Sequence, residues 1–302
     1  MPGVYTIIVT YNGNRWIERC LRQLIASEHS SHIIVVDNAS TDDTVEIVQR
    51  YQDHLELIRS SANLGFGGGN NLGIRHALEK EAKFLFLLNQ DAYVEPNCIG
   101  NLVSALEAVP GYGILSPLQL DASGKALDPA FKKYLTSSAG ETTANELLQQ
   151  RTQSIIPVRF VNAAAWMIPA DAIRKTGMFH PAFIHYGEDN HLCSRMQFHG
   201  FKTGITGCAA VIHDRGNEVK DALKQFIRQL RTVPLYTLLD IRKPFAIAWL
   251  LGYKKLNSIR KKTGQPANAL VTGVYEEQRQ WFRKNLQLAK QIRKETKEDA
   301  KL

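Results

Sequence analysis

The amino-acid sequence predicts an α/β fold, with a Rossmann-like, mostly parallel sheet flanked by helices and a basic helical C-terminal extension. Short apolar or β-branched runs alternate with helical patterns over residues 1–110, as in parallel βαβ units. The run Phe84 to Leu88 is apolar throughout and too short for a globular helix, which indicates a strand buried on both faces. Residues 220–302 carry 19 Lys and Arg against 7 Asp and Glu, a net charge of +12 that leaves −4 for residues 1–219.

The composition is that of an ordinary globular protein. At 302 residues the chain can bury a large core, and 44% hydrophobic with 22% charged residues is typical of soluble domains. The four cysteines show no C-x-x-C spacing and follow no secretory signal, so we expect neither a zinc site nor disulfides. A reducing, cytoplasmic environment is therefore expected.

Four strands are predicted in the first part of the chain, at residues 5–10, 32–37, 55–59 and 84–88. Helices are expected at 16–27 and, after a glycine-rich loop at 63–73, to about residue 80. The helix after the second strand should be capped by Ser40 or Thr41, and it begins with two acids at its positive end.

Asp91 follows the fourth strand and is the first candidate functional residue. Ligands of open parallel sheets bind beyond the carboxyl ends of the strands, so this carboxylate is placed to meet a ligand or its metal. The alternative is that Asn89 and Asp91 only shape the turn after the strand, because Asn and Asp are common in turns.

The segment Gly65 to Asn70 is rich in glycine but fits neither common phosphate-binding motif. Asn replaces the third glycine of G-x-G-x-x-G, the segment follows the third strand instead of the first, and no Gly-Lys-Ser/Thr closes any loop. A permissive backbone with a helix amino terminus behind it can still approach a phosphate or ribose. A flexible glycine turn without a ligand is the alternative.

Residues 111–219 show a weaker pattern. One strand is predicted at 114–120, followed by loops over the sheet edge and a solvated helix at 142–153, to which we assign no chemistry. A strand at 158–169 is interrupted by small residues at 162–165, which leave room for a ligand or for close packing against a helix. A last strand at 209–212 ends in His213, which can bind metal but in such a position is more often structural.

A second acidic cluster follows Tyr186. Gly187 supplies backbone freedom, and Glu188 and Asp189 begin a helix that extends to about residue 199, with a buried side formed by Leu192, Met196 and Phe198. The helix dipole favours two acids in a first turn whatever the function, so the cluster alone does not indicate catalysis.

Five short motifs, taken in order, resemble the family 2 glycosyltransferases, and within that family the bacterial rhamnosyltransferase-like members that build cell-envelope polysaccharide. They are Thr10-Tyr11-Asn12, Val36 to Asp42, Asn63 to Asn70, Leu88 to Asp91 and Tyr186 to Asp189, and the resemblance covers about residues 4–215. It implies a GT-A fold, a nucleotide-diphosphate-sugar donor, a divalent cation and inversion at the anomeric carbon.

The resemblance also implies roles for single residues. Asp37 would hold the base or ribose of the donor, Asp91 would be the metal-binding acid of the D-x-D motif with His213 beside it, and Asp189 would be the catalytic base. Glu188 is the first alternative base. The implied donor contacts are Thr10, Tyr11, Asn12, Asp37, Asn38, Gly65, Phe66, Gly67, Asn70, Asn89 and Gln90, and the implied acceptor contacts are Ala164, Trp166 and Tyr186.

The D-x-D motif departs from the family at its first position, where Asn89 replaces a carboxylate. An amide can hydrogen-bond a ribose or sugar hydroxyl, but it brings no negative charge. With Asp91, His213 and two phosphate oxygens as ligands, Mn²⁺ or Mg²⁺ suits the site, and the histidine favours Mn²⁺.

The chemistry of sugar transfer itself explains why there are two separate acids, whatever family the chain resembles. Displacing a nucleotide diphosphate requires charge neutralisation on the departing phosphates, which suits Asp91 with a metal. It also requires proton removal from the attacking hydroxyl, which suits Asp189. A glycoside hydrolase would leave Asp37 and the glycine segment without a task.

The basic extension contains ten mostly apolar residues, Pro244 to Tyr253, which are half of what a membrane-spanning helix requires. Lys and Arg at 254–262, beside Trp249 and Tyr253, suit an interfacial helix on anionic lipid, where lipid-linked acceptors reside. A helical cap or a homodimer surface is the alternative. Nucleic acid is not expected as a partner, because no aromatic-basic stacking motif accompanies the charge.

We therefore expect a catalytic domain at 1–219, with a nucleotide-sugar part at about 1–110 and an acceptor part at about 111–219, and a basic region at 220–302. The expected enzyme transfers hexose or deoxyhexose, with inversion, to a glycan or lipid-linked hydroxyl in the cytoplasm or on the inner face of the cytoplasmic membrane. The alternatives are a catalytically silent nucleotide-sugar or glycan-binding module and a membrane-surface adaptor acting through the tail. Retention of Asp37, Asp91 and Asp189 together favours the enzyme, because a binding module needs no base.

Overall fold

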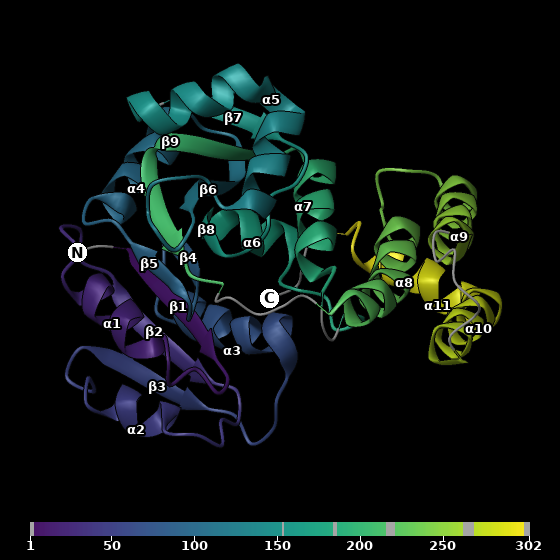
Figure 1. Ribbon diagram of the computed structural model, residues 1–302, viewed down its shortest axis with the longest axis horizontal. Coiled ribbons are helices and arrows are strands. Elements are labelled where there is room, and N and C mark those ends of the chain that lie inside the picture. Colours follow the sequence, from purple (N-terminus) through teal and green to yellow (C-terminus); the bar gives the residue numbers. More distant parts are fainter. Residues whose placement is uncertain (1–2, 153, 184–185, 216–220, 262–268, 299–302) are drawn as a thin grey trace.

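The computed structural model describes residues 3–152, 154–183, 186–215, 221–261 and 269–298. A central sheet lies between two layers of helices, and the helices of the C-terminal region extend to one side (Figure 1). The predicted α/β class with a Rossmann-like sheet is confirmed.

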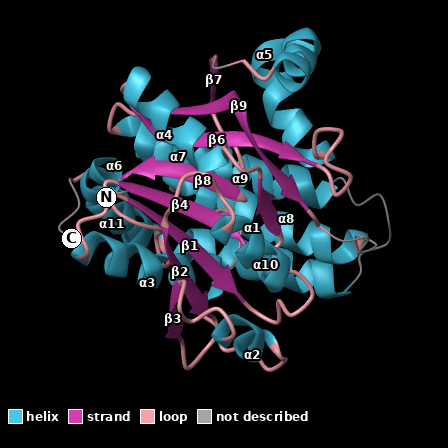
Figure 2. Ribbon diagram, turned by 90° about the vertical axis from the view of Figure 1, so that its left-hand side faces the viewer, coloured by secondary structure: helices cyan, strands magenta, loops and turns pink. Residues whose placement is uncertain are grey.

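The strands of the sheet lie in the order β3-β2-β1-β4-β8-β6-β9-β5, and β7 pairs with β9 beside this path (Figure 2). The four strands from β3 to β4 are parallel, whereas β8 is antiparallel to both β4 and β6. The bounds are β1 Val4–Thr10, β2 His32–Asp37, β3 Leu55–Arg59, β4 Phe84–Asn89, β5 Ala92–Val94, β6 Tyr112–Leu120, β7 Ile155–Val158, β8 Ala165–Pro169 and β9 Lys202–His213.

Helices cover both faces of the sheet. One core cluster joins the sheet to α1 Ile17–Ile25, α2 Thr44–Gln49 and α4 Cys98–Ala108. A second cluster joins the opposite face to α3 Gly65–Glu79, α5 Pro129–Gln150, α6 Ala170–Thr176 and α7 Glu188–Phe198. The sheet is therefore the middle of three layers.

Strand β4 is buried on both faces, as its sequence predicts. Leu85 and Leu87 belong to one core cluster, and Phe86 and Leu88 belong to the other. Side chains alternate between the faces of a strand, so a strand covered by helices on both sides has no polar face.

The carboxyl ends of β1, β2 and β4 are level with one another. Thr10 pairs with Asp37, and Val9 pairs with Asn89. The antiparallel strand β8 starts at the same edge, because Ala165 pairs with Leu88. The loops that carry the candidate residues therefore leave the sheet together, at the edge where open α/β sheets bind ligands.

The stretch predicted as loops over the sheet edge is largely helical, which corrects the sequence prediction. The N-cap of α5, Asp128, accepts hydrogen bonds from two backbone N–H groups of the first turn at 3.0 and 2.8 Å. Phe131 and Leu147 are buried, so the predicted helix at 142–153 is the second half of α5 and is not purely solvated. Gly140, with φ of 85°, interrupts the helix, so its apolar residues do not form one helical stripe.

Several other boundaries differ from the prediction. The predicted strand at 158–169 is two strands, β7 and β8, with different neighbours, and β9 begins at Lys202 instead of 209. Neither Ser40 nor Thr41 caps α2, whose N-cap is Asp43 without a side-chain hydrogen bond. The pattern also missed the short elements β5, α4 and α6.

Helix α7 begins at Glu188 as predicted, after Gly187 with φ of 94°. Leu192 and Met196 are fully buried, whereas Phe198 is 40% exposed, so its predicted burial is wrong. Polar residues of the helix are buried as well, because a chain segment before α7 and the C-terminal helices cover it.

The C-terminal helices are α8 Ala222–Leu238, α9 Phe245–Lys261, α10 Ala269–Lys284 and α11 Leu286–Glu295. They pack on one another and on α7 (Figure 1). Along the described parts of the chain, none of the helices has the length and apolarity needed to cross a bilayer. The predicted domain boundary between 219 and 220 lies outside the described residues and stays a prediction.

Candidate active site

Asp37 and Asn38 end strand β2 at the polar edge. The Asp37 side chain is 2% exposed, and both carboxylate oxygens accept from the backbone N–H of Ser40, at 3.2 and 3.4 Å. The backbone N–H of Asn38 donates to the carbonyl of Thr10 at 2.8 Å. The strand ends of β1 and β2 are therefore locked together, with Asp37 shaping the loop that follows.

The loop after β1 forms one wall of the edge. Asn12, with φ of 46°, accepts from the backbone N–H of Thr41 at 2.8 Å, and its own N–H donates to Ser40 Oγ at 3.0 Å. Tyr11 is 44% exposed beside this network. An exposed aromatic ring at the carboxyl edge can stack on a planar group of a ligand.

The glycine segment is the beginning of α3, so the prediction of a loop before the helix is wrong. The Asn38 amide donates to the carbonyl of Gly65 at 3.1 Å, and the Asn70 amide donates to the carbonyl of Phe66 at 2.9 Å. A Cβ placed on Gly69 would lie 2.7 Å from Val9 Cγ1. The glycines thus let α3 approach β1, and the first turn of α3 lies at the polar edge.

Gln90 braces the loop after β1. Its Oε1 accepts from Thr10 Oγ1 at 2.6 Å and from the backbone N–H of Tyr11 at 3.1 Å. A Cβ on Gly13 would overlap the same oxygen, so a larger residue there would displace the Gln90 amide. Asn89 is partly buried, and its backbone N–H donates to the carbonyl of Ala164 at 2.9 Å.

Asp91 and His213 are brought together, although 122 positions separate them in the chain. The short strand β5 pairs with β9, and Oδ1 of Asp91 lies 3.5 Å from Nε2 of His213. Nδ1 of His213 is buried without a hydrogen-bond partner. A carboxylate and an imidazole suit Mn²⁺ or Mg²⁺ together with donor phosphates, although the described residues contain no group of three or more His, Cys, Asp and Glu for a metal.

The two acids of α7 differ in burial. Glu188 is 5% exposed, its Oε2 has no hydrogen-bond partner, and burial together with the charge of Asp189 raises its pKa to about 7. Asp189 is partly exposed, and its Oδ1 accepts from the backbone N–H of Asn190 at 2.7 Å. Desolvation raises the pKa of Asp189, opposed by these hydrogen bonds and by the charge of Arg228.

Residues that the sequence did not single out surround Asp189. Arg228 of α8 lies with its guanidinium carbon 4.3 Å from the ring centroid of Tyr186. Burial and the negative charge of Asp189 raise the pKa of both Tyr134 and Tyr236. No local motif marks these positions, because they come from α5 and α8 and meet only in the fold.

The predicted acceptor contacts have different surroundings. Tyr186 is 55% exposed, whereas Ala164 and Trp166 are almost completely buried. The Trp166 ring stacks on Phe179 with the ring centroids 6.4 Å apart. Tyr186 alone of the three is open to an acceptor here, and the two residues before it, Ile184 and His185, lie outside the described residues.

Two family profiles match the chain. The profile of glycosyl transferase family 2 matches residues 5–150, and that of glycosyl transferase family group 2 matches residues 84–258. Together the matched ranges contain every residue of the candidate site.

Curated relatives are similar over most of the chain. The low-salt glycan biosynthesis hexosyltransferase Agl10 of Haloferax volcanii is 24% identical over 261 residues, which cover 85% of this chain and 79% of the relative. The N-acetylglucosaminyl-diphospho-decaprenol L-rhamnosyltransferase of Mycobacterium tuberculosis is 27% identical over 235 residues, which cover 70% of this chain and 76% of the relative.

Solved structures share the architecture. TarS 1-349 of S. aureus in complex with UDP-GlcNAc has a TM-score of 0.61 at 14% identity, covering 98% of this chain and 89% of that one; a longer TarS chain is covered to 43%. The mannosyltransferase PcManGT of Pyrobaculum calidifontis, in complex with GDP-Man and Mn²⁺, has a TM-score of 0.60 at 17% identity, covering 97% and 84%. At these identities the likeness shows the fold alone, which is the expected GT-A fold.

Proposed function

Since the chain belongs to the family 2 glycosyltransferases, we propose that it transfers hexose or deoxyhexose with inversion to a hydroxyl of a glycan or lipid-linked acceptor. The donor is a nucleotide-diphosphate-sugar, and the reaction is a single in-line displacement. The acid that accepts the proton is Asp189.

One observation supports this proposal most. The first turn of α7 lies against the first turn of α3, because a Cβ on Gly67 would lie 3.7 Å from the Cβ of Glu188. The helix that carries the proposed base is thus in contact with the helix whose glycine motif is assigned to the donor. A base beside the donor site is what an in-line attack on the anomeric carbon requires.

Asp189 is suited to remove the acceptor proton. It is reachable from solvent, and desolvation raises its pKa, which makes the carboxylate a stronger proton acceptor. Attack from the side opposite the departing diphosphate inverts the anomeric configuration. Glu188 is held close to the donor helix and is the alternative base.

Asp91 and His213 would hold a divalent cation, Mn²⁺ or Mg²⁺. Such a cation would neutralise charge on the diphosphate as it departs. The 3.5 Å spacing between Nε2 of His213 and Oδ1 of Asp91 supports this assignment, and the PcManGT structure contains Mn²⁺. Asp37, Tyr11, Asn12 and the start of α3 are assigned to the nucleotide.

The acceptor side is assigned to Tyr186 and Arg228. Arg228 contacts the ring of Tyr186 and its charge acts on Asp189, and an aromatic ring with a cation suits a sugar ring bearing an anionic group. The names of the relatives support polysaccharide or lipid-linked acceptors, since one acts in glycan biosynthesis and another on an N-acetylglucosaminyl-diphospho-decaprenol.

We also propose that α9 docks on the cytoplasmic face of an anionic membrane. Ile247 and Leu250 are 49% and 47% exposed on its outer side, and the exposed Lys254 lies one turn beyond Leu250, followed by the exposed Lys255. Apolar and cationic residues on one helix face suit an interfacial helix on anionic lipid. A homodimer through the same face is the alternative, and Lys262 lies outside the described residues.

A donor screen with product analysis tests the proposed function. The purified protein is incubated with a panel of nucleotide sugars and with glycan or polyprenyl-diphosphate-sugar acceptors, with and without Mn²⁺. We expect transfer from one class of donor, stimulated by Mn²⁺, and a product of inverted anomeric configuration by NMR. A product with retained configuration would contradict the single displacement.

A further inference from the structure

The segment that leads into helix α7 packs against the C-terminal helices. Phe183, which precedes α7, packs in an apolar cluster with Leu238, Leu239 and Phe282, and Arg228 lies over Tyr186. The site-forming start of the catalytic helix is thus built partly from a region remote in sequence.

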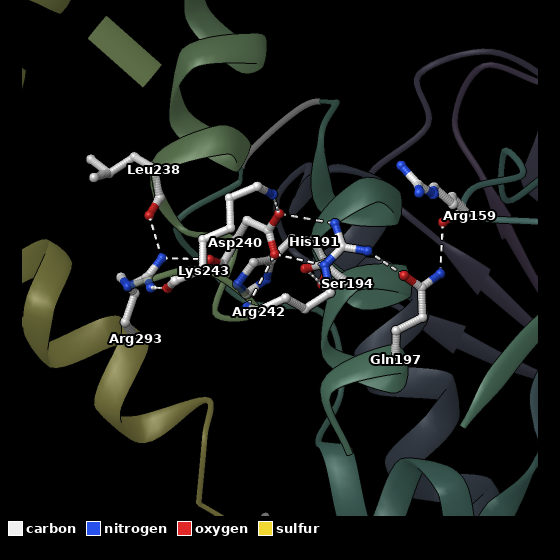
Figure 3. Close-up of polar contacts among 9 residues, drawn as sticks. All are labelled: Arg159, His191, Ser194, Gln197, Leu238, Asp240, Arg242, Lys243 and Arg293. Atoms are coloured by element: carbon white, nitrogen blue, oxygen red, sulfur yellow. Dashed lines mark hydrogen bonds and ion pairs between the residues drawn. The ribbon is translucent and has the colours of Figure 1, made fainter. Parts of the chain in front are cut away.

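The far end of α7 is joined to the connection between α8 and α9 by a polar network (Figure 3). Gln197 accepts a hydrogen bond from Nη1 of Arg242 and donates one to the backbone carbonyl of Arg159 at 2.8 Å. Nε and Nη2 of Arg242 donate to the two carboxylate oxygens of Asp240 at 2.7 and 2.9 Å. Both ends of α7 are therefore attached to the C-terminal helices.

Asp240 is the centre of this network. It is 4% exposed and also pairs with Lys243. Burial alone would raise the pKa of Asp240, but the hydrogen bonds and charges of Arg242 and Lys243 outweigh burial and lower it. The carboxylate is buried and the guanidinium of Arg242 is partly exposed, and their bidentate pairing fixes geometry in a way that a single-bond ion pair does not.

Arg293 of α11 holds the same connection from the other side. It is 4% exposed, and its Nη1 donates to the backbone carbonyls of Leu238 and Asp240 at 2.7 and 2.6 Å. Leu238 is the last residue of α8, where the helix leaves carbonyl acceptors unpaired, and Asp240 follows in the connection to α9. The segment that holds Gln197 is thereby anchored to α8 and α11.

We propose that the network of Asp240, Arg242 and Gln197 positions α7 so that Asp189 meets the acceptor hydroxyl. The inference rests on the proposed role of Asp189. Among the described residues, no hydrogen bond or ion pair links Gln197, Arg242 or Asp240 to a site residue, so they are positioning residues. Because a misplacement of about 1 Å can cost about 10²-fold in rate, loosening α7 should lower kcat and leave donor binding on β1, β2 and α3 unchanged.

The test uses the full chain, three single variants of Gln197 and Arg242 with one double variant, and a control variant elsewhere. Gln197→Leu removes the contact, Gln197→Glu keeps an acceptor for Arg242, and Arg242→Leu completes a double-mutant cycle with Gln197→Leu. The control is Arg231→Gln, because Arg231 is exposed and pairs with Glu277 at 3.5 Å within the C-terminal helices. Gln197 is partly exposed, so these variants should fold.

We expect Gln197→Leu to lower kcat at least about tenfold, with the donor KM within about twofold of the parent. Gln197→Glu should stay within about threefold of the parental kcat, and the double variant should be no slower than the slower single variant. Equal kcat in Gln197→Leu and parent, or an equal loss in Arg231→Gln, would overturn the inference.

Amide hydrogen exchange gives a readout that needs no activity. Gln197→Leu should speed exchange in residues 186–198 and leave β1 and α3 unchanged. Unchanged exchange in 186–198 would overturn the inference even if the enzyme is active. Faster exchange there, in a protein that transfers no sugar from any donor, would support the attachment of α7 and refute the proposed function instead.

Discussion

Glu188 and Asp189 are adjacent in sequence but lie in different surroundings. Glu188 faces the start of α3 with an unpaired Oε2, whereas Asp189 is partly exposed beside Arg228 and Tyr186. When the environments of two acids push their pKa values apart, the two acids can take different roles in catalysis. The sequence predicted the acid pair at a helix start and placed Asp91 and His213 at strand ends, but only its resemblance to the family implied that Asp91 and His213 act together. It could not distinguish the two acids, because burial depends on the whole fold.

Glu188→Gln should stabilise the protein at high pH and not at low pH. The folded pKa of about 7 lies above the ordinary value of 4.5, so the stability contributed by the protonated group is present below pH 4.5 and is lost as the pH rises through 7. That gap corresponds to about 3 kcal/mol. Denaturant unfolding of parent and variant at about pH 4 and pH 9 measures the difference in their free energies of unfolding. If both proteins showed the same pH dependence, the prediction would be refuted.

Helix α3 shows where sequence patterns fail at the scale of an element. Glycine disfavours helices, so the segment 65–73 predicted a loop. Tertiary packing overrides that preference, since a Cβ on Gly69 or Gly73 would lie 2.7 Å from Val9 or 2.5 Å from Ile7. The apolar strands β1, β2 and β4 were predicted correctly because burial on both faces leaves a clear pattern. The kinked α5 leaves none.

Gly69→Ala should destabilise the protein by about 1–3 kcal/mol, because the added methyl group overlaps Val9 of β1. The matched control is Gly273→Ala in α10, where a Cβ would meet nothing within 4 Å. That change should be stabilising by about 0.5–1 kcal/mol through helix propensity. Urea unfolding compares the two variants with the parent, and equal shifts in both would show that α3 does not need a close approach.

At the scale of the whole molecule, the C-terminal helices contribute to the candidate active site as well as to the surface. The sequence identified them as basic and helical, and their composition showed nothing of Arg228 beside Asp189 or of Arg242 on Gln197. Contacts between residues far apart in sequence carry no local pattern. This arrangement makes point variants better tests of the tail than its deletion, which would also free α7.

The pair of changes Ile247→Gln and Leu250→Gln should weaken binding to anionic vesicles about tenfold, since each removes apolar contact with the interface. Leu288→Gln is the control, because Leu288 is 45% exposed and belongs to a different helix, α11. Sedimentation with phosphatidylglycerol vesicles, compared with phosphatidylcholine, measures the effect. An equal loss in the control, or binding that is the same in all proteins, would favour the dimer surface.

The most direct test of the central claim is the single-turnover rate of Asp189→Asn, measured beside its donor affinity. Asn keeps the shape of the side chain and loses the proton acceptor, so the variant should bind donor and Mn²⁺ nearly as the parent does and transfer sugar at least about a hundredfold more slowly. Asp91→Asn should lose metal-dependent donor affinity as well as rate. A parental transfer rate in Asp189→Asn would contradict the account and make Glu188 the first candidate for the base.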